Sequence, residues 1–215
     1  MAGVIPTNYE IVFEPLFHNF KFNGEEIITL NLSKPTNSII LDAAELSIKE
    51  SHITQGRKII PAKSSLNEKN EKLTIKFAKK IKGKVKLSIK FTGTLNDRLL
   101  GFYRSQYKDG KGKTKYLATT QFEAADARRA FPCWDEPAVK ATFDVSLLVD
   151  KHLDAISNMP VASKKIVGSK ILYKFGRTPV MSTYLLYLGV GEFEYLHGKL
   201  RNIKIRIVTT KGNKN

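Results

Sequence analysis

Acidic, basic and aromatic residues lie close together between Thr119 and Phe143, in the segment TTQFEAADARRAFPCWDEPAVKATF. Gln121 and Glu123 are two residues apart in this segment, and on a β-strand that spacing places both side chains on one face. A carboxylate shielded from water binds an ammonium group well, and the α-ammonium of a peptide, with a pKa of about 8, is mostly charged at neutral pH. Glu123 is therefore a candidate ligand for a peptide amino terminus. Gln121 is a candidate for lining the pocket beside it.

The other charged residues of the segment are expected to brace it. Arg128 and Arg129 can hold nearby carboxylates in place, and we interpret Asp135 and Glu136 in the same structural way. The competing interpretation of Glu123 itself is an ordinary ion pair with Arg128. Cys133 is expected to be a small buried hydrophobic residue, because no histidine lies near it in the sequence to activate a thiolate.

The elements that position these residues are predicted to be strands, because apolar residues recur with a period of two. In residues 84–91, for example, valine, leucine, isoleucine and phenylalanine alternate with lysine and serine. Further strands are expected at residues 8–13, 26–32, 38–42, 46–53, 72–77, 143–149, 170–175, 182–190 and 203–207. Asn23-Gly24 and Asp109-Gly110 favour tight hairpin turns. A short helical turn is possible within 123–131, and the fold class is all-β.

The 215 residues can form one large β domain or two small ones. We expect this domain to span residues 1–208, with residues 209–215 as a tail or linker. The apolar runs are too short to cross a bilayer, so no membrane partner is expected. With one cysteine and no apolar signal segment near residue 1, the sequence favours a cytoplasmic protein.

The segment resembles the signature of the amino-terminal domain of zinc aminopeptidases of the aminopeptidase N and leukotriene hydrolase type. That family carries a Gln-x-Glu pair, which Gln121 and Glu123 match, followed by a longer pattern. The pattern is matched here by Ala127, Arg128, Phe131, Pro132, Cys133, Asp135, Glu136, Pro137, Lys140 and Ala141. Further matches are residues 101–105, 157–160, 181–185 and 189–191, in the order of the family. Ala124 departs from a proline often found there.

The resemblance implies a saddle-like β-sandwich of mixed sheets that anchors the amino terminus of a peptide substrate. Glu123 would bind the α-amine, and Gln121 would line the first specificity pocket. The family's zinc is held by His-Glu-x-x-His and a distant glutamate, and none of His18, His52, His152 and His197 lies in such a motif. We therefore expect no metal ligand, no catalytic residue and no activity in this chain alone. Zinc is expected in a catalytic domain, joined in cis or present as a separate chain.

Two other functions compete with this interpretation. The net charge is +16, and between residues 51 and 118 basic residues outnumber acidic ones by 18 to 4. Such a surface could bind nucleic acid or an acidic partner. Nucleic acid is the weaker choice, because the aromatic residues of these strands alternate toward the core and form no stacking platform. The other alternative is a non-catalytic interaction module with the same fold.

Overall fold

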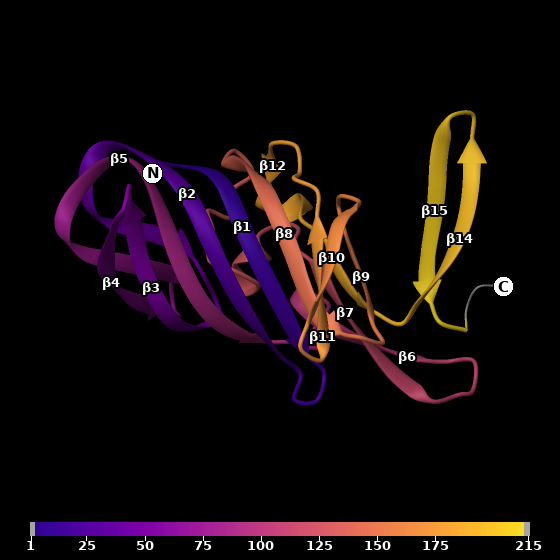
Figure 1. Ribbon diagram of the computed structural model, residues 1–215. Helices are drawn as coiled ribbons and strands as arrows, with labels where there is room; N and C mark the ends of the chain where they lie inside the picture. The colour runs from indigo at the N-terminus through magenta and orange to yellow at the C-terminus, as the bar shows by residue number, and fades with distance from the viewer. Residues whose placement is uncertain (1–2, 213–215) are drawn as a thin grey trace.

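The computed structural model describes residues 3–212, and within this range the chain is built from strands and two single-turn 3-10 helices (Figure 1). The strands are β1 Val4–Leu16, β2 Lys21–Asp42, β3 Ser47–Gln55, β4 Lys58–Asn67, β5 Lys72–Thr94, β6 Gly101–Lys108, β7 Thr114–Gln121, β8 Lys140–Asp150, β9 Asp154–Ser157, β10 Val161–Val167, β11 Lys170–Phe175, β12 Met181–Ser182, β13 Leu188–Gly191, β14 Phe193–Leu200 and β15 Ile203–Thr210. The helices are η1 Ala127–Arg129 and η2 Thr183–Leu185. The all-β fold class is confirmed.

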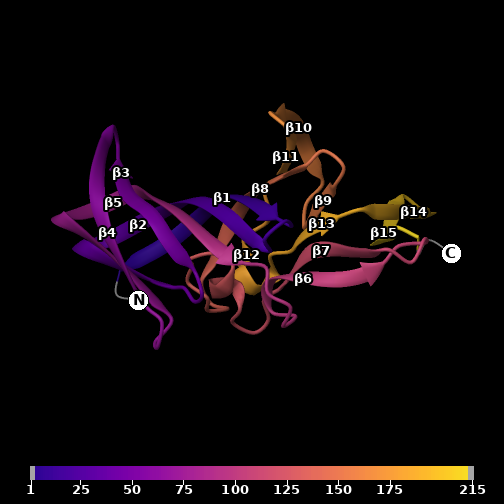
Figure 2. The ribbon, with the colours of Figure 1, turned by 90° about the horizontal axis from the view of Figure 1, so that it is seen from below.

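The strands form three sheets. The largest has the order β10-β11-β8-β1-β2-β5-β3-β4, with β12 added to β8, and it is mixed because β1 runs parallel to β8 and antiparallel to β2. A four-stranded sheet has the order β6-β7-β13-β9, and β14 and β15 form a ribbon of two strands. Figure 2 shows the four-stranded sheet beside the end of the large sheet, with the ribbon beyond it.

The core lies on the inner face of the large sheet and is rich in aromatic rings. Phe13 on β1 makes edge-on contacts with Phe22, Phe91, Phe102 and Phe131, at ring-centre distances of 5.6 to 6.3 Å. These five rings come from β1, β2, β5, β6 and the signature segment, and all are buried. The core therefore joins the large sheet, the four-stranded sheet and the signature segment.

The hairpin turn predicted at Asn23-Gly24 is wrong. Both residues lie inside β2, and the chain instead turns at residues 17–20, where Phe20 has a φ of 53°. Gly24 has a packing role: a Cβ at this position would lie 2.2 Å from the ring of Phe91. Glycine is needed here for the close approach of a ring and not for a turn.

Other strand predictions differ from the structure in extent. The strands expected at 26–32 and 38–42 are one strand, β2, with an irregular register near Thr36, and those at 72–77 and 84–91 are both parts of β5. The strand expected at 182–190 is interrupted by η2, where Ser182 donates to the carbonyl of Pro137 and Thr183 donates to Asp135. The Asp109-Gly110 turn between β6 and β7 and the helical turn η1 within 123–131 are confirmed.

Candidate functional site

The signature segment crosses from β7 to β8 and is anchored in the core at several points. Phe122 and Phe131 are buried, with ring centres 6.1 Å apart. Cys133 pairs with Asp42 at the end of β2 through two backbone hydrogen bonds of 2.7 and 3.0 Å. The segment is thus held against the large sheet over much of its length.

An ion-pair cluster around Arg128 reinforces this anchoring. The Arg128 Nε donates to Asp135 at 3.1 Å, and its Nη1 donates to Glu71 at 3.0 Å. The side chain of Asp135 is 1% exposed and also accepts a bond from Thr183 of η2, while its backbone N–H donates to Asp42. The backbone N–H of Arg128 also donates to this carboxylate at 3.2 Å, so the buried carboxylate of Asp135 is satisfied.

Arg129 makes a second, more exposed set of ion pairs. It bonds Asp126 through Nε at 2.9 Å, Glu71 through Nη2 at 2.9 Å, and Glu45 through Nη1 at 2.5 Å. The bracing role predicted for the two arginines is confirmed. Sequence reasoning missed Asp42, Glu45 and Glu71 as partners, because they lie in distant segments and no local spacing points to them.

Gln121 and Glu123 lie side by side at the end of β7, although only Gln121 belongs to the strand. Gln121 is the last residue of β7, opposite Gly101 of β6. Both side chains are exposed, and the backbone N–H of Glu123 donates to Oε1 of Gln121 at 3.2 Å. The Glu123–Ala124 peptide bond is cis. Because β7 ends at Gln121, the predicted shared strand face is wrong for Glu123, and the observed contact joins the Gln121 side chain to the Glu123 backbone.

Further polar residues lie near Gln121 on the four-stranded sheet. Thr119, two residues earlier on β7, donates to the hydroxyl of Tyr187 at 3.2 Å. The backbone N–H of Tyr187 donates to Oδ1 of Asn158 at 2.8 Å, which fixes the segment before β13. Gly189 of β13 makes room for both Ile156 and the Tyr187 hydroxyl, since a Cβ there would lie 2.8 Å from Ile156 and 3.0 Å from that hydroxyl. The alternation of Thr119 with Gln121 was the available sequence signal for this face.

Glu123 differs from Asp126 and Asp135 in its ion pairing. Glu136 is also exposed and forms no ion pair in the part of the chain that the structure describes, so the bracing role predicted for it is not found. Asp126 and Asp135 are bonded to Arg129 and Arg128, whereas within residues 3–212 Glu123 forms no ion pair. The competing interpretation, an ion pair between Glu123 and Arg128, is contradicted. An exposed carboxylate beside a neutral amide can accept hydrogen bonds from a cationic group of a ligand.

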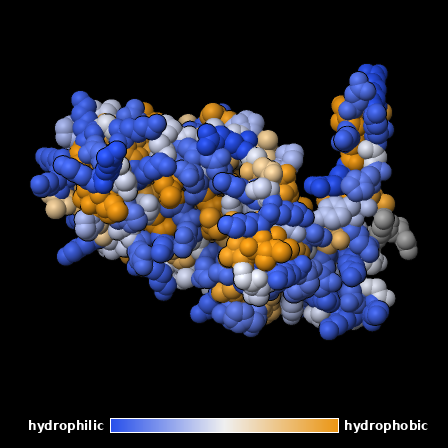
Figure 3. All heavy atoms as spheres, viewed as in Figure 1, coloured by the Kyte–Doolittle hydropathy of each residue, from blue (hydrophilic) through white to orange (hydrophobic). Residues whose placement is uncertain are grey.

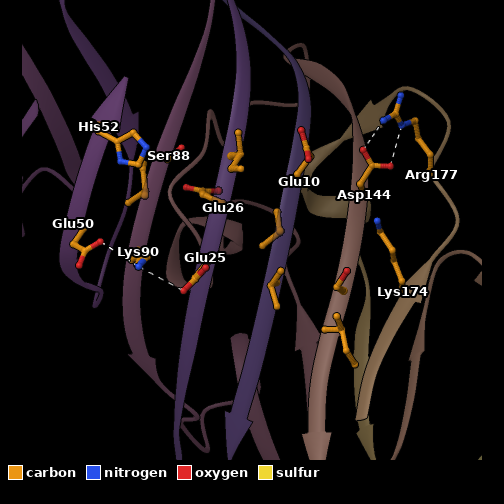
Figure 4. A pocket seen from close by; sticks show the side chains of 16 residues that line it. Glu10, Glu25, Glu26, Glu50, His52, Ser88, Lys90, Asp144, Lys174 and Arg177 are labelled. Carbon is orange, nitrogen blue, oxygen red and sulfur yellow. Dashed lines mark hydrogen bonds and ion pairs between the residues drawn. The ribbon is translucent and has the colours of Figure 1, made fainter. Parts of the chain in front are cut away.

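A separate hollow of about 640 Å³ lies on the outer face of the large sheet, away from the signature residues (Figure 4). Some of its charged groups are paired. Arg177 holds Asp144 with two bonds of 2.9 and 2.7 Å, which lowers the pKa of that carboxyl group, and Lys90 lies 3.2 Å from Glu50. Glu26 also lines the hollow, and its buried carboxyl group has no hydrogen-bond partner within the described residues. Because the hollow lies apart from the signature residues, it is a candidate separate from the Gln121–Glu123 surface.

The remaining sequence candidates behave as structural or surface residues. Cys133 is buried, and burial raises the pKa of its thiol well above the ordinary value, so the reactive thiolate is disfavoured. His18, His152 and His197 are exposed, and His52 is half-buried. Across the described residues, no three histidine, cysteine or acidic side chains are grouped so that they could hold a metal ion.

Together the fold and the site define an all-β domain with a firmly braced segment, in which Glu123 and Glu136 are the exposed acids without an ion pair among the described residues. Residues 5–185 match the family described as the Peptidase M1 N-terminal domain, and the chain belongs to that family. The family resemblance noted from the signature is thereby confirmed.

Curated relatives are aminopeptidases. The chain is 42% identical over 213 residues to Aminopeptidase M1-D of Oryza sativa subsp. japonica, 41% identical over 216 residues to Aminopeptidase 2 of Candida albicans, and 42% identical over 215 residues to the Puromycin-sensitive aminopeptidase of Caenorhabditis elegans. These alignments cover 97–98% of this chain but 23–24% of each relative. The chain therefore spans about a quarter of the length of these relatives. In the described part of the chain, no helix has the length and apolar character needed to span a membrane.

Proposed function

We propose that this chain is the substrate-anchoring amino-terminal domain of a zinc-dependent aminopeptidase. Glu123 binds the α-ammonium group of the peptide, and Gln121 lines the first specificity pocket. The observation that supports the proposal is that Glu123 combines an exposed, unpaired carboxylate with a contact to Gln121, whereas Glu136, the other exposed and unpaired acid of the segment, has no contact with Gln121 among the described residues. Asp126 and Asp135 are bonded to arginines, whereas Glu123 is exposed, carries no ion pair within residues 3–212, and lies beside the Gln121 amide.

The braced segment suits this role because a binding carboxylate must be held in a fixed position. Phe122 is buried immediately before Glu123, and η1 follows four residues later with Arg128 and Arg129 fixed by their ion pairs. A carboxylate held in this way loses little conformational freedom when it binds an ammonium group. Closure of the site by a second domain would exclude water and strengthen the pair.

The catalytic chemistry belongs to another part of the enzyme in this proposal. A bound zinc ion would activate water and polarise the peptide carbonyl. The described residues provide no group of three ligands for it, so the zinc is assigned to the catalytic domain, in cis or as a separate chain. This chain by itself should bind the amino terminus of a peptide without hydrolysing it.

We also propose a cytoplasmic location. The proposal rests on a single cysteine, which is buried and unpaired, as is usual for proteins in reducing compartments. A mitochondrial location is the alternative to test, because one relative, from Saccharomyces cerevisiae, is named Aminopeptidase 2, mitochondrial. Cell fractionation with antibody detection would contradict the proposal if the protein were found in an organelle.

The amine-binding role of Glu123 is tested by Glu123→Ala in the chain joined to a catalytic domain. Loss of the charge pair should cost about 2–4 kcal/mol of transition-state binding, measured as a fall in kcat/KM for an aminoacyl substrate. Glu123→Gln should show a loss of the same kind, because the amide keeps the shape and loses the charge. Glu68→Ala, which removes an exposed acid in the turn between β4 and β5, is the control. An unchanged kcat/KM for Glu123→Ala would exclude the amine-binding role.

A further inference from the structure

The hollow on the outer face of the large sheet crosses six neighbouring strands. Its volume is about 640 Å³, and its lining comes from β3, β5, β2, β1, β8 and β11, together with Arg177 after β11 (Figure 4). Figure 3 shows hydrophilic and hydrophobic residues interspersed over β2, β1 and β8. Neither Gln121 nor Glu123 lines the hollow, so it is a site separate from the signature segment.

One row of side chains crosses the hollow from end to end, because the strand register aligns them. From β3 to β11, the row consists of Glu50, Lys90, Glu25, Val12, Ser146 and Lys174, each directly opposite the next. Directly opposed residues of neighbouring strands point to the same face of a sheet, and all six line the hollow. The row therefore presents its side chains to one bound ligand.

The end of the row on β3, β5 and β2 is acidic. The ammonium group of Lys90 lies 3.2 Å from the carboxylate of Glu50 and 4.0 Å from that of Glu25, so one cation is shared by two acids. Both glutamate side chains are 64% exposed, and solvent screening keeps such surface pairs weak. Two negative charges against one positive charge leave an excess negative charge at this end, which can attract a cation.

The end of the row on β8 and β11 is basic. Arg177 is bonded to Asp144 at 2.9 and 2.7 Å. Lys174 supplies a second cation, which is exposed and forms no ion pair within residues 3–212. Figure 4 shows the Lys174 side chain directed toward Asp144 and Arg177. Two positive charges against one negative charge leave an excess positive charge at this end, which can attract an anion.

The middle of the hollow offers polar groups over a short apolar floor. Ser88 lies opposite His52 across β5 and β3, and Ser146 lies on β8. None of these three side chains has a hydrogen-bond partner within residues 3–212, so each can bond to a ligand. Val12 and Ile27 also line the hollow and are half-buried. A mixed lining of this kind suits a peptide chain, whose backbone amides need hydrogen-bond partners.

The width of the hollow sets the length of the ligand. Lys174 on β11 is three strand spacings from Glu25 on β2 and five from Glu50 on β3. With about 4.8 Å between neighbouring strands, the charged ends are separated by about 14 to 24 Å along the sheet. An extended chain advances by about 3.3 Å per residue, so about four to seven residues span this distance.

We propose that this hollow binds a short peptide whose two termini are free, with the peptide extended across the strands. The α-ammonium group of the peptide is bound by Glu25 and Glu50, and its α-carboxylate is bound by Lys174 and Arg177. The opposite charges at the two ends set both the selectivity and the direction of the ligand, because a reversed peptide meets like charge at each end. The site uses none of the groups assigned to amine binding at Glu123 and does not depend on the proposed function.

Nuclear magnetic resonance tests the site with pentaalanine as the probe. The protein is the 215-residue chain carrying Glu123→Ala, so that amine binding at the signature segment does not contribute. Pentaalanine should shift the amide signals of β2, β5, β8 and β11, with a Kd of about 1 mM or tighter. Pentaalanine that is acetylated at its amino terminus or amidated at its carboxyl terminus should bind at least about fivefold more weakly. Equal binding of the three peptides, or no shifts on these strands, would overturn the proposal.

Variants at the two ends provide a matched comparison. Glu50→Gln should weaken the binding of pentaalanine but not of its acetylated form, which has no ammonium group. Lys174→Gln should weaken the binding of pentaalanine but not of its amidated form, which has no carboxylate. Lys165→Gln, which removes an exposed lysine on β10 outside the hollow, is the control and should change neither. Equal losses for Lys174→Gln and Lys165→Gln, or saturable binding of inorganic phosphate without binding of pentaalanine, would contradict a peptide site.

Discussion

Glu26 is a buried acidic residue in the core of the large sheet. It lies on β2 with 1% exposure, and within the described residues neither oxygen of its carboxyl group has a hydrogen-bond partner. Burial raises its pKa well above the ordinary value, and Tyr9 and Cys133 are the titratable groups that feel its charge. The carboxyl group is therefore held neutral in the folded protein over a pH range in which the unfolded chain ionises it.

This raised pKa predicts a pH-dependent stability. Because the folded pKa lies above the unfolded value, the contribution of Glu26 to stability is largest below the unfolded pKa of about 4.5, and it falls by roughly 1.4 kcal/mol per pH unit up to the folded pKa. Glu26→Gln removes this titration, so the variant should gain stability over the wild type as pH rises from 4 to 8 in urea unfolding. Glu25→Gln, on the exposed face of the same strand, is the control. Parallel pH profiles for wild type and Glu26→Gln would refute the prediction.

At the scale of the element, the signature segment is held mainly by tertiary contacts, and the adjacent arginines have unequal roles. Arg128 pairs with Asp135 and lies 3.9 Å from Asp42. The side chain of Asp135 is 1% exposed, and that of Asp42 is 4% exposed. The partners of Arg129 are Glu45, Glu71 and Asp126, which are 25% to 43% exposed. Solvent therefore screens the ion pairs of Arg129 more strongly than the ion pair between Arg128 and the buried Asp135.

This difference predicts distinct costs for two neighbouring substitutions. Arg128→Met leaves the buried carboxylate of Asp135 without its counter-ion, whereas Asp42 keeps its ion pair with Lys72, and the variant should lower the free energy of unfolding by about 3–5 kcal/mol. Arg129→Met should cost about 1 kcal/mol or less. Denaturant unfolding of both variants measures the difference, and equal losses would show that burial does not set the strength of these pairs.

At the scale of the whole molecule, the large positive charge needs no nucleic-acid partner. Several of the strand lysines are paired with acids across the sheet: Lys86 lies 3.1 Å from Glu10, and Lys90 lies 3.2 Å from Glu50 (Figure 4). Many other lysines are exposed along β4 and β5, where their charges face solvent. The basic surface is thus interrupted by acidic side chains on the outer face of the large sheet.

We therefore expect weak and non-specific binding to nucleic acid. In fluorescence anisotropy, a single-stranded 20-mer should bind with a Kd no tighter than about 10 µM at 150 mM salt. Lys84→Glu should leave even this binding almost unchanged, because no single lysine forms a defined site. A submicromolar Kd that weakens steeply with salt would contradict the expectation and favour the nucleic-acid interpretation.

The sequence by itself determined the fold class, the family and the residues of the signature segment. Alternation with a period of two reports which side chains face a core, and it requires no knowledge of which strands pair. For the same reason, it could not show that 26–32 and 38–42 form one strand, or that Gly24 is required by the ring of Phe91 and not by a turn.

The tertiary structure decided which charges meet. Arg128 finds Glu71 and Asp42 across more than fifty residues of chain, and these contacts leave Glu123 as the acid without an ion pair among those between Thr119 and Asp135. The exposed apolar face of β14–β15 was likewise hidden in the sequence, where Ile203, Ile205 and Ile207 have the pattern of an ordinary core strand. Periodicity shows that a face is apolar, but only the packing of the other elements shows whether it is covered.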